Sequence, residues 1–387
     1  MHKMKSEQII GLEEKYIMQT YTRFPIVVDK GIGCYVFDKN GKKYLDFLGG
    51  IACNPAGHGN KEVANAIAKQ AEKLLNISNL YYTEQQVILA EKLVKISGLG
   101  KCFFCNSGAE ANETAFKLAR KITGKTKIIA MEHAFHGRTF GALAATWKMK
   151  YKQPFEPLVP GFAHVPYNNI DAVYSAIDLN TAAVIAEPIQ GEAGIIVPDK
   201  GYLAKLKKIC EEQKILLIAD EVQSSLRTGK FFAYQHENIK PDIVTLAKGI
   251  ANGVPIGICI ANKGLDFDKG NHASTFGGNS LACAAANATI DFILKKKLVE
   301  NAEKIGNYFI KKLNELKEKK AIIKEVRGKG LMVAIELNKE VNPYVDKCLE
   351  KGLIVNNVTD TAMRFLPPLT IKEKEVDECI EILDEVL

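Results

Sequence analysis

The chain has 387 residues, of which 47 % are hydrophobic and 25 % charged, and its formal net charge at pH 7 is +7. This composition is typical of soluble globular proteins, and no apolar run approaches the length of a membrane span. The opening stretch MHKMKSEQIIGLEEKY mixes acids with bases and does not resemble a secretory signal. Basic residues alternate with acidic ones in stretches such as ILKKKLVE, which favours solvated helix faces over a nucleic-acid surface. We expect a cytoplasmic protein with no nucleic-acid or membrane partner.

The nine cysteines show no spacing typical of a disulfide framework, so we interpret them as free thiols in a reducing compartment. Cys102 and Cys105 form a Cys-x-x-Cys pair inside an apolar run, and no second pair completes a zinc site. His133 and His136 form a His-x-x-His pair that also lacks a further ligand. We therefore predict no metal site.

Taken in chain order, the first element is a hairpin in CYVFDKNGKKYLDF that turns at Asn40–Gly41. The middle of the chain then alternates amphipathic stretches with short, nearly continuous apolar runs, typical of strands that are buried on both faces. These runs are CFFCNS, KIIAMEH, AAVIAEP, ILLIADE and DIVTLAK. The alternation predicts an α/β fold with a mostly parallel sheet covered by helices.

The pattern changes near residue 285, where a long helical stretch precedes short strands in LMVAIEL, LIVNNV and AMRFLPPL and a closing helix in KEKEVDECIEILDEVL. This order of elements predicts a smaller α+β domain. We divide the chain into an N-terminal segment, 1–50, that joins the small domain, a large domain, 51–284, and a C-terminal small domain, 285–387.

Polar residues follow the predicted strands where those strands end, and the carboxyl ends of such strands are where α/β sheets bind ligands. Ser107, Gly108 and Glu110 form a capping-box pattern that opens a helix, and a helix N-terminus is suited to phosphate. Asp220 ends an apolar strand, so its carboxylate needs a lysine, a metal or a protonated ring nitrogen. Lys248 ends another apolar strand and is followed by glycines.

Each of these features has a plain structural explanation when taken singly. A phosphate cradle, a buried aspartate and an activatable lysine together match pyridoxal 5'-phosphate. Its phosphate needs an anion site, its ring nitrogen needs a carboxylate, and its aldehyde needs a lysine amine. We therefore interpret Lys248 as a neutral amine held in an imine with this cofactor.

The chain resembles the class III pyridoxal-phosphate aminotransferases, most closely the N-acetylornithine aminotransferases. The resemblance covers nearly the whole chain and is carried by eight ordered motifs: YLDFLGGIACNPAGH, NSGAEANE, HAFHGRTFGAL, AEPIQGEAGI, IADEVQ, LAKGIANGVPIG, HASTFGGNSLACAAA and MRFLPPL. It implies fold type I, with a large mostly parallel-sheet α/β domain and a smaller α+β domain.

The resemblance assigns cofactor roles residue by residue. Lys248 would be the Schiff-base lysine and Asp220 the partner of the pyridinium nitrogen. The other cofactor-binding residues would be Ser107, Gly108 and Ala109 at the phosphate, Phe135 and Val222 on the two ring faces, Gln223 near the ring hydroxyl, and Thr275 at the phosphate of the neighbouring subunit. The active sites would therefore be shared across a homodimer.

Substrate roles carry over in the same way. Arg138 and Arg364 match the family's two carboxylate-binding arginines, whose planar forks bind carboxylates bidentately. Glu187 matches the gating glutamate, which would pair with Arg364 while the amine donor is bound. One departure is the loop in DEVQSSLRTGKF, where only Ser224–Leu226 precede Arg227, one residue fewer than in the family and without its two glycines. We expect a tighter loop there, and we carry over no family position for Arg227.

The resemblance predicts a ping-pong transfer of the δ-amino group of N-acetylornithine to 2-oxoglutarate, a step of arginine biosynthesis. The alternatives on the same fold are ornithine δ-aminotransferase, succinyl-diaminopimelate aminotransferase and 4-aminobutyrate aminotransferase. An aminomutase acting on glutamate semialdehyde would have little use for two substrate arginines. A non-enzymatic pyridoxal-phosphate-binding regulator would carry a DNA-binding module, and no such module is visible.

Overall fold

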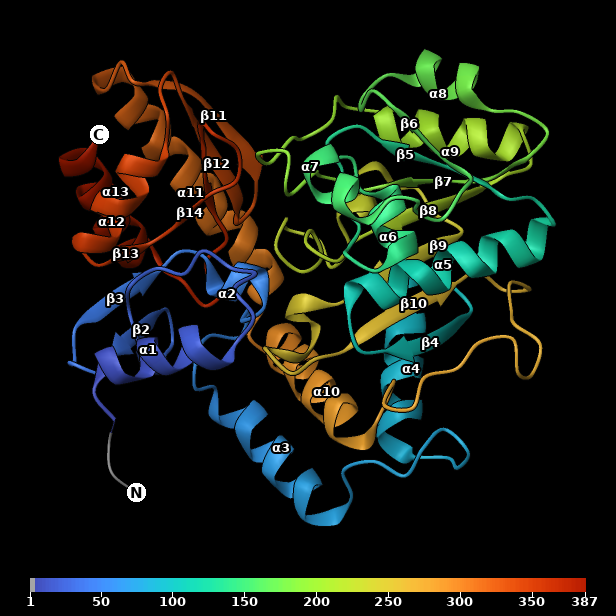
Figure 1. Ribbon diagram of the computed structural model, residues 1–387, viewed down its shortest axis with the longest axis horizontal. Helices are drawn as coiled ribbons and strands as arrows, with labels where there is room; N and C mark the ends of the chain where they lie inside the picture. The colour runs from blue at the N-terminus through green and yellow to red at the C-terminus, as the bar shows by residue number, and fades with distance from the viewer. Residues whose placement is uncertain (1–3) are drawn as a thin grey trace.

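The computed structural model describes residues 4–387, arranged in two lobes (Figure 1). Residues 1–3 of the predicted segment 1–50 lie outside this range. The larger lobe is built on a seven-stranded sheet in the order β4-β10-β9-β8-β7-β5-β6. Strand β10 alone is antiparallel to its neighbours, which confirms a mostly parallel sheet. The strands are β4 (Lys101–Cys105), β5 (Lys127–Met131), β6 (Phe162–Val165), β7 (Thr181–Ala186), β8 (Leu216–Asp220), β9 (Ile243–Leu246) and β10 (Gly257–Ala261).

The central strands are apolar throughout because helices cover both faces of the sheet. In β5, Ile128 and Ala130 pack into one hydrophobic cluster, while Ile129 and Met131 pack into another on the opposite face. All five apolar runs of the sequence form strands of this sheet. The sequence patterns did not predict β6 and β10. Strand β6 is only partly buried, and β10 follows a glycine-rich turn.

Helix α5 shows how the sequence sets the ends of a covering helix. Ser107 is its N-cap, and the Ser107 side chain accepts a hydrogen bond from the backbone N–H of Glu110. Gly124 ends the helix in the left-handed conformation. Helix α5 spans Gly108–Thr123. The other helices before residue 280 are α1 (Ser6–Tyr16), α2 (Gly49–Ala52), α3 (Lys61–Lys73), α4 (Glu84–Ser97), α6 (Phe140–Ala145), α7 (Met149–Lys152), α8 (Ile170–Ala176) and α9 (Tyr202–Glu212), with 3-10 turns η1 (Gln153–Phe155), η2 (Ala233–Glu237) and η3 (Lys248–Ala251).

The smaller lobe joins the two ends of the chain. In one sheet the N-terminal hairpin strands pair with each other, and β3 pairs in parallel with β13 near the C-terminus. A second sheet has the order β11-β12-β15-β14. The strands are β1 (Val28–Ile32), β2 (Tyr35–Asp38), β3 (Lys43–Asp46), β11 (Ile323–Lys329), β12 (Met332–Leu337), β13 (Leu353–Ile354), β14 (Asn356–Asn357) and β15 (Ala362–Phe365).

The long helical stretch of the sequence is two helices, α10 (Ser280–Lys295) and α11 (Leu298–Lys319). The break falls at Lys297, whose backbone is left-handed with φ 52°, so the helix cannot continue through it. Helix α10 packs against α3 and α4 (Figure 1), whereas α11 packs against β11 and α13. The last two helices are α12 (Asn342–Glu350) and α13 (Glu373–Val386). Because α10 crosses residue 285, the three-part division of the chain stays a prediction.

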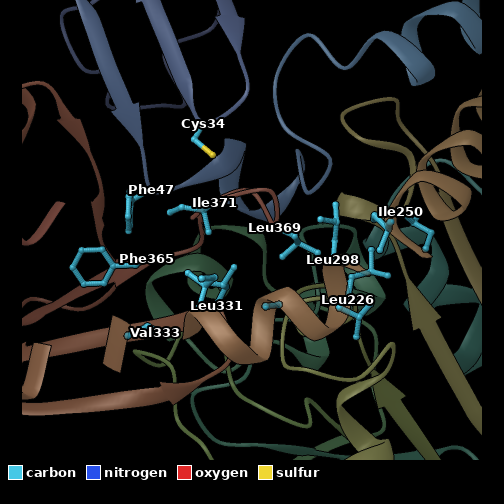
Figure 2. Packing of buried hydrophobic residues seen from close by; sticks show 14 of the residues in the cluster. Cys34, Phe47, Leu226, Ile250, Leu298, Leu331, Val333, Phe365, Leu369 and Ile371 are labelled. Atoms are coloured by element: carbon cyan, nitrogen blue, oxygen red, sulfur yellow. The ribbon is translucent and has the colours of Figure 1, made fainter. Parts of the chain in front are cut away.

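One hydrophobic cluster runs between the lobes. Figure 2 shows Phe47 from the N-terminal region, Phe365 from β15, and Leu226 and Ile250 from the larger lobe as members of this cluster. Ile250 belongs to η3, the turn that begins at Lys248. The position of Lys248 is therefore tied to the packing of both lobes. Within residues 4–387, no helix is long and apolar enough to cross a membrane.

Helix α11 approaches the turn before β12 so closely that only glycine fits. A Cβ atom on Gly306 would lie 2.2 Å from the carbonyl carbon of Gly330. We expect Gly306→Ala to lower the free energy of unfolding by roughly 1–3 kcal/mol, the usual cost of an overpacked core. Urea denaturation measures this change. Gly11→Ala is the control, because Gly11 lies in α1 with open space around it. Equal stability of the two variants would contradict the packing explanation.

Candidate functional site

A cavity of about 440 Å³ lies at the carboxyl ends of the central strands. Of the site residues predicted from sequence, all line this cavity except Thr275 and Arg364. The other residues that line it are Cys53, Asn106, Asn112, His136, Gly137, Ala247, Gly253, Val254, Pro255 and Ile256. Residues far apart in the sequence are brought together here because parallel strands end at the same edge of a sheet.

Lys248 extends into the cavity just after β9. Its backbone has φ 43°, a left-handed conformation that is costly for a residue with a side chain. Burial lowers the pKa of Lys248, and the nearby carboxylate of Glu192 opposes that effect. No side chain among the described residues forms an ion pair with Lys248. Its amine is therefore more readily deprotonated than a surface lysine, which makes it a nucleophile.

Asp220 is a buried carboxylate at the end of β8, with 3 % of its surface exposed. Its Oδ2 atom accepts hydrogen bonds from Asn112 Nδ2 (2.8 Å) and His136 Nδ1 (2.7 Å), and its Oδ1 accepts from the backbone N–H of Val222 (3.0 Å). The Asn112 amide is oriented in turn by the hydroxyl of Thr245, which donates to its Oδ1 (2.8 Å). No lysine or arginine in the described part of the chain pairs with Asp220. Its carboxylate also lines the cavity, where a cationic group can approach it.

The N-terminus of α5 forms the third side of the cavity. The Glu110 carboxylate accepts from the backbone N–H of Asn106 (2.8 Å) and also bonds to the Ser107 hydroxyl (3.1 Å). A Cβ atom on Gly108 would lie 2.8 Å from Val222 Cγ1, so glycine is required for this close approach. The first N–H groups of a helix lack carbonyl partners within it, and with the helix dipole they attract an anion.

These three features fit pyridoxal phosphate. The helix N-terminus suits the phosphate, Asp220 suits a protonated ring nitrogen, and Lys248 suits an aldehyde. A model of the class-III aminotransferases matches residues 16–387. The chain belongs to the class-III aminotransferase family. It is a pyridoxal-phosphate-dependent transaminase.

Named relatives of this aminotransferase match it over nearly its full length. It is 50 % identical over 394 residues to the acetylornithine aminotransferase of Methanocaldococcus jannaschii, covering 99 % of this chain and 98 % of the relative. It is 47 % identical over 381 residues to that of Aquifex aeolicus, covering 96 % and 100 %.

Solved structures extend this agreement to the fold. The ornithine aminotransferase from Toxoplasma gondii has a TM-score of 0.96 at 33 % identity, covering 99 % of this chain and 95 % of that one. The acetylornithine aminotransferase from Elizabethkingia anophelis has a TM-score of 0.88 at 37 % identity, covering 99 % of both chains. These matches confirm the predicted fold type I.

The two predicted substrate arginines have different surroundings. Arg138 is exposed at the edge of the cavity, and its guanidinium lies over the ring of Tyr151, with Cζ 3.5 Å from the ring centroid. Arg364, on β15, has only 1 % of its surface exposed. Its Nη1 donates to Glu192 Oε1 (2.5 Å) and to Gln223 Oε1 (3.2 Å). Arg364 therefore adjoins the cavity through Gln223, which lines it.

The predicted pairing of Glu187 with Arg364 is wrong in this structure, because Glu192 pairs with Arg364 instead. Glu187 directly follows β7, and its carboxylate accepts from the backbone N–H groups of Phe135 (3.0 Å) and Gly191 (2.9 Å). It therefore joins the loops on two sides of the cavity. The motif AEPIQGE contains two glutamates, and only the second lies on the loop that reaches Arg364. The first, Glu187, lies at a strand end, a position from which its side chain can bond to the loops on either side.

The two glutamates also differ in acidity. Burial raises the pKa of Glu187 to about 7, with the charge of Asp220 adding to the effect and that of His136 opposing it. Burial is also the largest single effect on Glu192 and raises its pKa. The charges of Arg364 and Lys248, together with the hydrogen bonds from Arg364 and Gln223, outweigh burial and bring the pKa of Glu192 to about 2. Glu192, with 34 % of its side chain exposed, is thus the permanently charged partner of Arg364.

Thr275 lies outside the cavity of its own chain. It is exposed and lines a separate cavity of about 1090 Å³ together with Ser78, Phe104 and Lys269. Its role at the phosphate of a neighbouring subunit stays a prediction.

The shortened loop Ser224–Leu226 is buried and tightly turned. Leu226 adopts φ 72° at a position that glycine would occupy without strain, and its side chain packs in the core that joins the lobes. Arg227 is also buried, and its guanidinium donates to the carbonyl of Leu331 (3.2 Å), which in turn donates its N–H to the Arg227 carbonyl (2.8 Å). Arg227 therefore links the two lobes and does not line the cavity.

Sequence reasoning missed Asn112, His136 and Glu192. His136 was considered only as half of a His-x-x-His pair, but His133 is exposed while His136 bonds to Asp220. No group of three or more potential metal-ligating side chains occurs in the part of the chain described here. Asn112 lies two residues after the capping box, on the side of α5 that faces the strand ends, and this position is the signal that could have found it.

Glu187 generates a pH prediction. Because its pKa is raised, the folded chain holds a proton that the unfolded chain releases between about pH 4.5 and 7. The free energy of unfolding should therefore fall as pH rises through this window, by up to about 3 kcal/mol. Glu187→Gln should remove this part of the pH dependence. Urea denaturation of both proteins at pH 5 to 8, with the cofactor at one saturating concentration, measures the difference. Parallel curves for the two proteins would contradict a raised pKa.

Proposed function

We propose that this aminotransferase transfers the δ-amino group of N-acetylornithine to 2-oxoglutarate, a step of arginine biosynthesis. The observation that carries the proposal is a pair of arginines at the cavity that contains Lys248. Arg138 has no ion-pair partner among the described residues, whereas Arg364 pairs with Glu192. A transaminase must bind two substrates in turn at one site. Here one substrate has a single carboxylate and the other has two. The full-length identity to acetylornithine aminotransferases supports the choice of donor.

The cavity residues would hold pyridoxal phosphate as follows. Lys248 would bind it covalently, Asp220 would bind its ring nitrogen, and the N-terminus of α5 at Ser107–Ala109 would bind its phosphate. The remaining contacts would come from Phe135 and Val222 on the ring faces and from Gln223 near the ring hydroxyl. When bound, the cofactor supplies the aldehyde that takes up the amino group and a ring that stabilises negative charge on the reacting carbon.

The side chains would then divide the remaining work. Once the substrate amine has taken its place on the cofactor, the Nζ atom of Lys248, with its lowered pKa, would take a proton from the donor carbon that bears the amino group. In the second half-reaction it would deliver a proton to the corresponding carbon of the acceptor. Asp220 keeps the proton on the ring nitrogen of the bound group, because an anion adjacent to it favours the charged form. Asn112 and His136 hold the carboxylate of Asp220 in one orientation.

Substrate exchange follows from the two arginines. Arg138 binds the α-carboxylate of the amine donor. Glu192 stays paired with Arg364 during that half of the cycle. The second carboxylate of 2-oxoglutarate or glutamate then displaces Glu192 from Arg364. Since a carboxylate on the ligand replaces a carboxylate on the protein, Arg364 is never left as an unpaired buried charge.

A second copy of the chain supports the site in this proposal. The segment after α3 exposes large apolar side chains: Leu75, Ile77, Leu80, Tyr81, Tyr82 and Val87, and Phe276 next to Thr275 is 61 % exposed. An apolar surface of this kind is typical of a subunit interface. We propose a homodimer in which Thr275 contacts the phosphate in the partner's site. The nine free cysteines support a reducing, cytoplasmic location.

The donor is tested by a single half-reaction without acceptor, followed by the visible absorption of the bound cofactor. We expect N-acetylornithine to convert the cofactor rapidly and free ornithine slowly, with succinyl-diaminopimelate and 4-aminobutyrate as further comparisons. Faster conversion by ornithine would favour an ornithine aminotransferase, the activity named for the Toxoplasma gondii structure. Lys248→Ala is the control: it should retain the fold but lose the lysine-linked spectrum and turnover.

Glu192 is tested by neutralising its charge. In Glu192→Gln, an incoming dicarboxylate no longer has to displace a charged partner of Arg364. We expect the glutamate concentration for half-maximal rate to fall about tenfold, since a hydrogen bond between charged groups contributes roughly 1.5–3 kcal/mol. The half-reaction with N-acetylornithine should not gain in the same way. Glu187→Gln keeps the Arg364 partner and should show no such fall; a similar fall in both variants would contradict the assignment.

A further inference from the structure

Arg138 is an exposed cation whose position is nevertheless defined. It forms no ion pair with any side chain that the structure describes. Two aromatic rings flank it instead, with its Cζ 3.5 Å from the centroid of Tyr151 and 5.6 Å from that of Phe135. The closer ring, Tyr151, does not line the cofactor cavity. It therefore contacts Arg138 from outside the cavity.

The stacked arrangement leaves the hydrogen-bonding capacity of the arginine intact. A ring covers the flat face of a guanidinium, whereas the N–H donors lie in the guanidinium plane. A carboxylate approaches in that plane, so ring and carboxylate can bind Arg138 together. A protein carboxylate would have to be displaced first, as Glu192 must be at Arg364.

Tyr151 is itself held in place. It lies in the short helix α7, where its backbone N–H donates to the carbonyl of Lys148 (2.9 Å). The next residue, Lys152, donates through Nζ to the carbonyl of Ala144 (3.1 Å), which ties this helix to α6. The Tyr151 hydroxyl has no hydrogen-bond partner among residues 4–387. The ring, and not the hydroxyl, makes the contact with Arg138.

We propose that Tyr151 is a positioning residue for the substrate α-carboxylate, because its ring holds the Arg138 guanidinium in its binding orientation before substrate arrives. This inference rests on the proposed role of Arg138. Without the ring, a long and mobile side chain would have to be ordered by the substrate itself, which weakens binding. We expect weaker binding only for substrates that carry the carboxylate, with no change in the chemistry at Lys248.

The test compares two donors on the holoenzyme in the half-reaction: N-acetylornithine and N-acetylputrescine, which has the same chain without the carboxylate. For each donor we divide the maximal rate by the donor concentration at half-saturation. The ratio of the two quotients, N-acetylornithine over N-acetylputrescine, measures recognition of the carboxylate. In Tyr151→Leu this ratio should fall roughly 3- to 30-fold, the range of a cation–π contact. The fall should come from a higher N-acetylornithine concentration for half-saturation, while the maximal rate of the variant stays within about twofold of the unsubstituted enzyme. Tyr151→Phe should keep the ratio, as should Tyr174→Leu, which changes an exposed tyrosine on α8.

The outcomes separate this inference from the proposed function. If Arg138→Ala lowers the ratio and Tyr151→Leu does not, the role of Tyr151 is overturned and Arg138 remains the carboxylate site. An unchanged ratio in Arg138→Ala overturns both. Equal losses in Tyr151→Leu and Tyr151→Phe would assign the effect to the hydroxyl and overturn the stacking explanation. Slower reaction with both donors alike in Tyr151→Leu would show a general structural defect and would also overturn it.

Discussion

The buried carboxylate of Asp220 is the group on which the rest of the site depends. It is held by donors from Asn112, His136 and Val222, without a lysine or arginine partner in the described chain. A buried anion of this kind interacts strongly with a cation placed beside it, because little water screens the pair. The neighbouring strand end carries Lys248, whose pKa is lowered by the same burial. One cavity therefore favours a ligand cation at one point and a neutral amine at another.

The two arginines that we propose as carboxylate-binding residues are held in two different ways. Arg364 is buried, so its charge must be paired at all times, and Glu192 is its partner in this structure. Arg138 is exposed, so water can solvate its charge, and it needs only to be oriented. The ring of Tyr151 can do this without competing with a ligand. The difference in burial thus explains why one arginine has an acidic partner and the other an aromatic one.

The site belongs to both lobes of this aminotransferase. Arg364 comes from the smaller lobe and contacts Gln223 of the larger one, while Arg227 of the larger lobe bonds to Leu331 of the smaller. The hydrophobic cluster that joins the lobes includes Ile250, in the turn that begins at Lys248 (Figure 2). We therefore expect changes in the packing between the lobes to move the backbone of Lys248.

The sequence by itself determined the central strands, the start of α5, and the presence of Asp220 and Lys248 at strand ends. These features are local, since each depends on a run of side chains or on a cap within a few residues. The break at Lys297 was not predicted, because the residues on both sides of it favour helix and tertiary packing decides where the chain turns.

Only the tertiary structure decided which groups meet. The sequence placed two glutamates in one motif, and the wrong one, Glu187, was predicted to pair with Arg364. Burial at the strand end turns Glu187 toward backbone N–H groups, whereas Glu192 lies on a loop within reach of the arginine. His136 became a partner of Asp220 in the same way. Hydrogen-bond partners are set by distances between segments that lie far apart in the chain, and no local pattern encodes those distances.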